Sequence, residues 1–276
     1  MRLKWYGTAT ILLEHDGTRL LFDPFFTLNE SLFCPSADEY AKAEHILITH
    51  GHLDHIVHIP QILQHGGNKA TVYCTGTPRR MLVSKGVDVS RLVEVSPGDS
   101  LVIGPFDVSV LKSRHIAFDA RLVLRTFLSP RVLSRPGNMK YLLRENKVCL
   151  EAGETVVYDI TVHGVTSRGA DAPNASACDK HILLLGSLNL DDGTEYPTGA
   201  DLLIIPLQGR SDICTYAIPF IDRLQPKMVL PDHYDDTFPP ISSYVNPQPF
   251  IENMRLKHPE VRVLCPPPGP EWVDIW

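Results

Sequence analysis

A short histidine-rich segment, residues 49–55, constrains the fold of this chain more than any other feature. It directly follows an apolar run at residues 45–48 and holds four potential metal ligands, His50, His52, Asp54 and His55. In an extended chain residues i and i+2 point to the same side, so His50 and His52 can converge on one ion. The side chains of the adjacent Asp54 and His55 diverge from each other, and they can reach a second metal position. The spacing therefore predicts two neighbouring metal sites, and a histidine-rich surface loop is the alternative.

A hydrolytic metal centre needs three protein ligands per ion and an open position, so further ligands must come from elsewhere in the chain. His115 and His233 each follow a predicted strand, at residues 108–112 and 228–231. Each could be delivered to the same edge of the fold as His50. An ordinary surface or core histidine is the alternative at both positions.

The four ligands of the segment match the H-x-H-x-D-H motif of the metallo-β-lactamase superfamily of metal-dependent hydrolases. Residues 5–7, 10–14 and 20–24 resemble the opening of the branch that includes ascorbate-6-phosphate lactonase. Residues 228–234 resemble the last strand of that branch and its final metal-binding histidine. The resemblance spans nearly the whole chain. It implies an α/β fold, a four-layer αββα sandwich.

The resemblance also assigns the ligands. His50, His52 and His115 would form the first site, and Asp54, His55 and His233 the second. One or two divalent ions are expected. Zinc is the first choice, and manganese, iron or nickel are the alternatives, because nitrogen-rich sites discriminate poorly among these metals.

Two further residues bear on the metal sites. Asp23 resembles the buried aspartate of the family, which orients the histidine segment without binding metal, and a turn residue before Pro24 is the alternative. Ser187 occupies the position where relatives place an aspartate that bridges both ions. A hydroxyl lacks the negative charge of a bridging carboxylate, so the second ion is expected to bind weakly or not at all. Asp191 and Asp192 could replace it, although their Asp-Asp-Gly context is typical of a turn.

The predicted function is hydrolysis of a small ester, lactone or phosphoester by metal-activated water. Asp54 is the predicted catalytic residue, because it could orient the nucleophile if its own metal position is empty. Arg210 is a predicted anion contact, with a solvated loop arginine as the alternative, and Tyr234 is a predicted hydrogen-bond donor to the substrate. A redox di-metal protein of the same fold and a degenerate metal-binding protein without turnover are the competing functions. The flavin-linked iron members of the superfamily usually carry Glu at the position of His52, which argues against the redox function.

Strand and helix patterns divide the chain into two strand-then-helix halves, so we expect one domain over residues 1–276 with two sheets between helices. Residues 118–146 are expected to be a helical insertion that shapes the pocket mouth or a subunit contact. Residues 121–128 and 141–144 are predicted to be helical, with breaks at 129–130 and 135–138. Residues 167–179 are predicted to be an exposed loop.

Composition limits the partners. A formal net charge of −6 over 276 residues argues against binding to nucleic acid or to an anionic membrane surface. There is no apolar run of the roughly twenty residues that a transmembrane helix needs, and residues 1–8 do not resemble a secretory signal. Six scattered cysteines without a C-x-x-C pair fit a reducing cytoplasm. The expected partner is a small-molecule substrate, and a homo-oligomer is compatible with the sequence.

Overall fold

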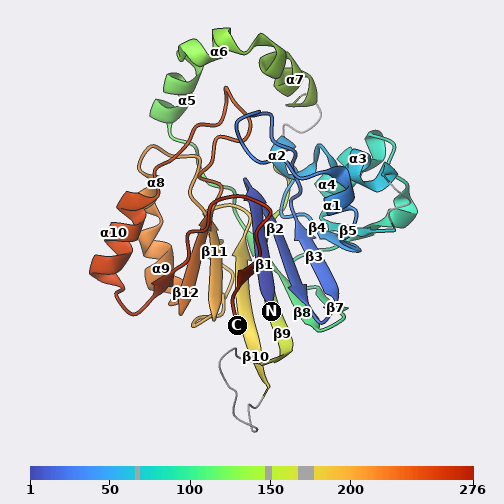
Figure 1. The fold of residues 1–276 in the computed structure, drawn as a ribbon, viewed down its shortest axis with the longest axis vertical. Helices are drawn as coiled ribbons and strands as arrows, with labels where there is room; N and C mark the ends of the chain where they lie inside the picture. The colour runs from blue at the N-terminus through green and yellow to red at the C-terminus, as the bar shows by residue number, and fades with distance from the viewer. Residues whose placement is uncertain (66–68, 147–150, 167–176) are drawn as a thin grey trace.

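The computed structural model describes residues 1–65, 69–146, 151–166 and 177–276. Two seven-stranded sheets pack face to face, and helices cover both outer faces (Figure 1). The predicted four-layer αββα sandwich is confirmed. Most of the predicted loop at residues 167–179 lies outside the described residues.

The first sheet begins as an antiparallel meander and continues with parallel strands. Its spatial order is β14 (Val273–Asp274), β1 (Arg2–Gly7), β2 (Thr10–His15), β3 (Thr18–Phe22), β4 (His45–Leu47), β5 (Thr71–Cys74) and β6 (Leu92–Glu94). The turn between β2 and β3 has positive φ angles of 45° at Asp16 and 77° at Gly17. Two such angles are what a tight hairpin turn of this kind requires, and Asp-Gly meets that requirement at low cost.

The second sheet has the order β13 (Arg262–Val263), β12 (Met228–Asp232), β11 (Leu202–Pro206), β10 (Cys178–Leu185), β9 (Thr155–Val165), β8 (Phe106–Ser113) and β7 (Ser100–Ile103). Strands β10 to β13 are parallel, whereas β9 is antiparallel to both β8 and β10. The carboxyl ends of β8, β10 and β12 therefore meet at one edge of this sheet.

The cores follow the two-residue period of the strands. Leu20 and Phe22 of β3 pack between the two sheets, whereas Leu21 packs against the outer helices. Leu47 of β4 likewise faces the second sheet, and its neighbours Ile46 and Ile48 face the helices. Successive side chains of a strand point to opposite faces, so a sheet buried on both faces needs unbroken apolar runs.

The outer helices are short. Helices α1 (Ala37–Tyr40), α2 (Leu53–Ile56), α3 (Ile59–Gln64) and α4 (Gly76–Ser84), together with the 3₁₀ turn η1 (Val89–Arg91), accompany the first sheet. Helices α8 (Ile213–Tyr216), α9 (Ile218–Leu224) and α10 (Gln248–Lys257) lie beside β11 and β12 (Figure 1). Residues 213–224 form two helices and not one. Pro219 lies in the first turn of α9, and because it has no N–H it cannot continue a helix from α8.

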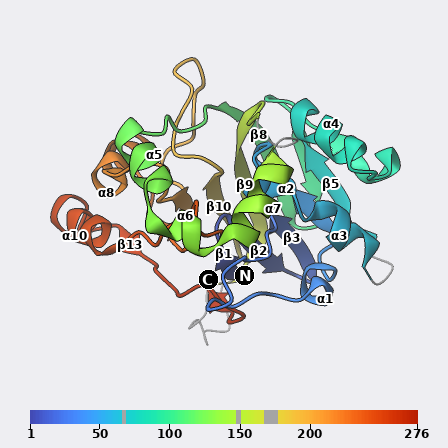
Figure 2. The same cartoon turned by 90° about the horizontal axis from the view of Figure 1, so that it is seen from above.

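Three helices form an arch above the edge where β8, β10 and β12 end, and Figure 2 shows them crossing over the sheets. The arch comprises α5 (Ala120–Phe127), α6 (Pro130–Ser134) and α7 (Pro136–Asn146). Helix α6 and the early start of α7 differ from the prediction, in which Pro130 and Pro136 are breaks. Proline is instead favoured in the first turn of a helix, and Ser129 Oγ caps α6 by accepting from Arg131 N at 3.3 Å. Within the described ranges, no helix has the length and apolar character needed to cross a bilayer.

Candidate metal centre

All six predicted metal ligands lie at one edge of the sandwich. His50 follows β4, His115 follows β8 and His233 follows β12. His52 is the residue that precedes α2 and is still extended, with φ −70° and ψ 156°. Asp54 and His55 lie in the single turn of α2. The short helix directs these two side chains toward His233, and the ring of His55 still lies beside that of His50, with 3.9 Å between the ring centroids.

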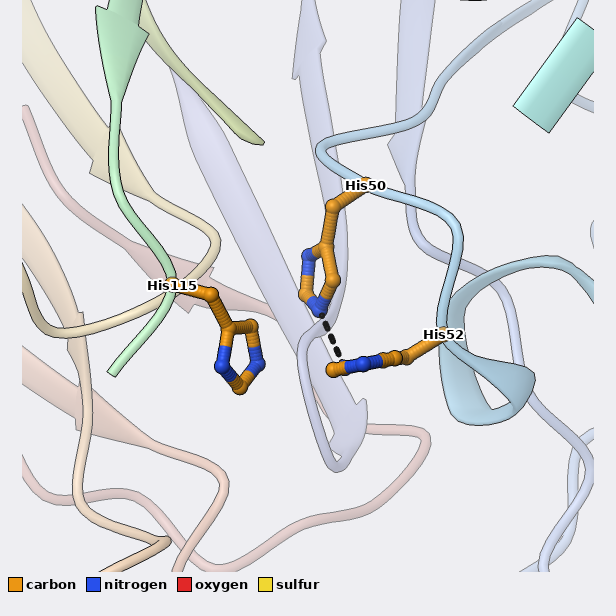
Figure 3. A group of neighbouring side chains, drawn as sticks. All are labelled: His50, His52 and His115. Carbon is orange, nitrogen blue, oxygen red and sulfur yellow. Dashed lines mark hydrogen bonds between the residues drawn. The ribbon is translucent and has the colours of Figure 1, made fainter. Parts of the chain in front are cut away.

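The ligands form the two expected groups. His50, His52 and His115 each offer a ligand atom, and these atoms lie within 4.8 Å of one another (Figure 3). Asp54, His55 and His233 meet the same criterion. In the second group, Asp54 Oδ2 lies 2.9 Å from His233 Nε2 and 3.6 Å from His55 Nε2. The predicted convergence of His50, His52 and His115 is found, and their binding of metal stays a prediction.

The first group has the dimensions of a metal site. His50 Nε2 and His52 Nδ1 lie 3.2 Å apart (Figure 3). Nitrogens that bind a tetrahedral zinc ion at about 2.0–2.1 Å are separated by roughly 3.3–3.4 Å. The two rings thus need almost no movement to share an ion.

Asp23 and Thr49 orient these rings. Asp23 is fully buried, and its carboxylate accepts from Thr49 N at 2.8 Å, from Thr49 Oγ1 at 2.6 Å and from His55 Nδ1 at 2.9 Å. Because the Thr49 hydroxyl proton goes to Asp23, Thr49 Oγ1 accepts from His50 Nδ1 at 3.0 Å. His115 Nδ1 donates to the carbonyl of Ile116 at 2.8 Å. His50, His55 and His115 therefore carry their proton on Nδ1 and turn Nε2 to the site.

The backbone at this edge adopts uncommon conformations. Asp23 and His233 have φ angles of 44° and 58°, which residues other than glycine rarely adopt. His233 N donates to Thr8 O at 3.0 Å, and Asp23 N donates to Leu47 O at 3.1 Å. Such conformations persist where surrounding contacts hold them, and they cluster at functional sites.

The charge state of the two groups differs. Burial lowers the pKa of His50, His52 and His115, that of His52 to about 4, so these rings are neutral at pH 7. Burial also disfavours charge on His55 and His233, but nearby carboxylates outweigh it and raise the pKa of both rings: Asp23 and Asp54 act on His55, and Asp54 and Asp235 act on His233. Burial by itself would raise the pKa of Asp54, yet His55 and His233 lower it. Neutral imidazoles and a carboxylate are the donors that a divalent cation requires, so the residues fit a metal.

Ser187 lies beside the metal groups at the end of β10. Its Oγ accepts from Ile116 N at 2.9 Å, which fixes the segment that carries His115. The preceding residue must be glycine, because a Cβ on Gly186 would lie 2.1 Å from the side chain of Thr49. Asp191 does not take the bridging position. Its carboxylate is held by Lys112 at 3.2 Å and Arg114 at 3.1 Å, and Asp192 pairs with Arg114 at 2.7 Å.

The two predicted substrate contacts are placed elsewhere. Arg210 pairs with Asp212 at 2.7 Å and does not line the cavity above the metal groups. Tyr234 is buried, with its ring 4.7 Å from that of Trp5 and its hydroxyl donating to Pro266 O at 3.2 Å. Its side chain contacts the carboxyl-terminal segment. Substrate contacts by Arg210 and Tyr234 stay predictions.

A cavity of about 430 Å³ lies between the metal groups and the arch. All six predicted ligands line it, together with Ser187. Its volume is in the range of small-molecule sites. Sequence reasoning did not identify Thr49, although a hydroxyl directly before the first histidine was the available signal.

Comparisons with known proteins agree with this fold. A family model described as a beta-lactamase superfamily domain matches residues 18–125. A UPF0173 metal-dependent hydrolase of Archaeoglobus fulgidus is 25% identical over 269 residues, which cover 98% of this chain and 97% of that protein. Among solved structures, a metallo hydrolase from Ignicoccus hospitalis has a TM-score of 0.60 at 17% identity, covering 99% of this chain and 98% of that one. A metallo-β-lactamase fold protein from Bacillus subtilis has a TM-score of 0.61 at 13% identity with the same coverage.

Proposed function

We propose that this chain, a member of the metallo-β-lactamase superfamily, is a metal-dependent hydrolase that cleaves a small ester, lactone or phosphoester. The observation that carries the proposal is the pair of ligand groups, each within 4.8 Å, at the floor of one cavity. The name of the Archaeoglobus fulgidus relative, which spans the full chain, supports it.

His50, His52 and His115 would hold a first ion, zinc foremost, and Asp54, His55 and His233 a second. A divalent ion there would act as a Lewis acid that activates water and stabilises negative charge as it develops on the substrate. The protein contributes oriented ligands, since Asp23, Thr49 and the carbonyl of Ile116 hold the Nδ1 protons away from the site. Such outer hydrogen bonds raise the basicity of the ligands and fix their orientation.

Asp54 is the proposed catalytic residue. Its carboxylate lines the cavity and stays ionised at neutral pH, because His55 and His233 lower its pKa. When the second ion is absent, the carboxylate can accept a hydrogen bond from a water molecule and orient that water toward the substrate. A lactone, which is a cyclic ester, is one of the proposed substrates. The resemblance of residues 5–24 to the ascorbate-6-phosphate lactonase branch supports a lactone substrate.

Metal content and turnover, measured together, test the proposal. Protein purified without added metal is analysed for bound metals, and the protein is then assayed on esters, lactones and phosphoesters with and without a chelator. His50→Ala should lose metal and activity together. His65→Ala is the matched control, because the His65 side chain is 42% exposed, pairs with Asp38 and does not line the cavity. Turnover that survives complete metal removal would refute the proposal.

A further inference from the structure

We infer that the substrate of this cavity is an uncharged molecule with an apolar acyl group, and that the arch selects it. This inference rests on the proposed function and narrows its substrate class. The cavity has a polar floor of metal ligands, whereas its remaining walls are largely apolar. Leu122, Met139, Leu142 and Leu143 of the arch contribute one wall, and Leu188 and Phe238 contribute others.

Charge is the decisive feature of these walls. Among the described residues that line the cavity, none is a lysine or arginine, and Asp54 is the one carboxylate. Two guanidinium groups beside the cavity are already paired: Arg210 with Asp212, and Arg131 with Asp236 and the carbonyl of Ser242. A phosphate or carboxylate on the distal part of a substrate would lose its water without gaining a cation. Such a loss strongly disfavours binding, whereas an apolar chain gains from the same walls.

Two polar side chains of the walls, Gln208 and Ser242, bind other parts of the protein. Gln208 Nε2 donates to Ser243 O at 3.1 Å, and its Oε1 accepts from Gly209 N at 3.3 Å. Ser242 Oγ donates to Asp236 Oδ1 at 2.9 Å and accepts from Phe238 N at 2.8 Å. These side chains hold loops in place around the cavity. They do not form a cluster prepared for an anion.

The apolar wall of the arch is fixed in position. Asn138 Nδ2 lies 3.2 Å from Leu28 O and 3.0 Å from Pro239 O, so one side chain links α7 to two loops of the sandwich. His58 Nδ1 accepts from Phe26 N at 3.1 Å, which leaves Nε2 protonated to donate to Tyr141 at 3.2 Å. His58 thus contacts α7 and not the metal ligands. A wall held in this way binds an apolar group without first having to be ordered.

Calorimetry tests the inference without relying on turnover, because it measures how tightly three probe amides bind to the metal-loaded protein. The probes are hexanamide, hexanamide carrying a sulfonate at its far end, and hexanamide carrying a trimethylammonium group there. A sulfonate is chosen because it is a poor metal ligand. Hexanamide should bind at least about tenfold more tightly than either charged probe. From acetamide to hexanamide the affinity should rise by up to about fourfold per methylene group.

Variants connect the preference to the arch. Leu122→Lys places a cation on the cavity wall and should favour the sulfonate probe over hexanamide, while Leu122→Gln should weaken hexanamide without favouring the sulfonate. Leu128→Lys is the matched control. Leu128 lies in the same arch but is 73% exposed and does not line the cavity, so the preference should not change.

The outcomes separate the two proposals. Tighter binding of the sulfonate probe to the unmodified protein, or hydrolysis confined to anionic esters, would overturn the inference and leave the hydrolase proposal standing. Preferred binding of hexanamide together with no cleavage of 4-nitrophenyl acetate, butyrate or hexanoate by the metal-loaded protein would uphold the apolar pocket and count against the hydrolase.

Discussion

Asp23 and Thr49 show how a metal site depends on residues that do not touch the metal. One buried carboxylate accepts from the backbone and hydroxyl of Thr49 and from the ring of His55, and the same hydroxyl then orients His50. Ser187 also acts without being a metal ligand, because its hydroxyl positions the backbone beside His115. Short side chains around the ligands therefore determine which nitrogen each ring presents.

Thr49→Val should weaken metal binding at the first site by about 10- to 100-fold, because it removes the hydroxyl that accepts from His50 and donates to Asp23. Thr49→Ser keeps the hydroxyl and is the matched control. Competition with a chromophoric zinc chelator measures both affinities. Equal zinc affinity in the valine variant and the unmodified protein would show that the hydroxyl does not orient His50.

Ser187 leads to a prediction about metal stoichiometry. Without a bridging carboxylate the content should lie nearer one ion per chain than two, because two cations about 3.5–4 Å apart repel and need shared negative charge. Ser187→Asp should raise occupancy of the second site. Ser187→Ala should leave that site weak and, by removing the hydrogen bond to Ile116 N, loosen the His115 segment slightly. Metal analysis after dialysis against a mild chelator checks this. Two ions held tightly by the unmodified protein would contradict it.

The arch is the element that turns an open edge of the sandwich into a cavity. It contacts the rest of the fold through a few side chains, among them Asn138, Tyr141 and the pair Lys85–Glu145 at 2.6 Å. Much of its outer surface is apolar and exposed, including Leu124, Leu128 and Leu133. Its inner surface lines the cavity. Among the described residues, the main core lies between and beside the two sheets, and the arch contributes to it through Leu142 and the partly buried Tyr141.

Replacing residues 119–146 by a short glycine-serine linker should therefore leave the sandwich folded and abolish the preference for apolar acyl groups. The reason is that the arch supplies five of the apolar side chains at the cavity, Leu122, Val123, Met139, Leu142 and Leu143. Circular dichroism and urea unfolding report on the fold, and activity toward 4-nitrophenyl esters of increasing acyl length reports on selection. A deletion that unfolds the protein would instead assign the arch to the main core.

At the scale of the whole molecule, one ion-pair cluster ties α1 to the first sheet. Glu39 accepts from Lys4 at 2.7 Å, from Tyr6 at 2.6 Å and from Lys42 at 2.8 Å. Partial burial alone would raise the pKa of Glu39, but these donors outweigh it and lower the pKa to about 2. Folding thus favours the ionised carboxylate. Its stabilising effect is complete above the ordinary pKa of 4.5 and is lost as the pH falls toward 2.

Glu39→Gln should accordingly reduce the free energy of unfolding at pH 7 and reduce it much less at pH 2.5. Other carboxylates titrate over the same range, so the informative quantity is the difference between the two proteins at each pH. Urea titrations at both pH values provide it. A difference that does not change with pH would show that the ionised form of Glu39 is not stabilised by folding.

Local chemistry determined much of the fold. Strand and helix patterns predicted the two halves of the fold, Asp16-Gly17 is a sequence that favours the tight turn between β2 and β3, and the ligand spacing at residues 50–55 predicted the two metal groups. These features are local, because they depend on backbone sterics and on side chains within a few residues of one another. The interpretation of Pro130 and Pro136 as breaks was wrong, because it considered each proline by itself and not the residues around it. A proline can end one helix or begin another, and its neighbours decide which.

Tertiary structure alone decided what surrounds the metal groups. The sequence suggested Arg210 and Tyr234 as substrate contacts, yet Arg210 pairs with Asp212 and Tyr234 with the segment at Pro266. Asp191 looked available for the bridge, but Lys112 and Arg114 hold it. Asp23 holds Thr49, and Ser187 holds the backbone beside His115, from segments far away in the chain. The arch that closes the cavity also comes from a distant segment. A side chain's partners depend on which strands and helices pack together, and no periodicity within one segment carries that information.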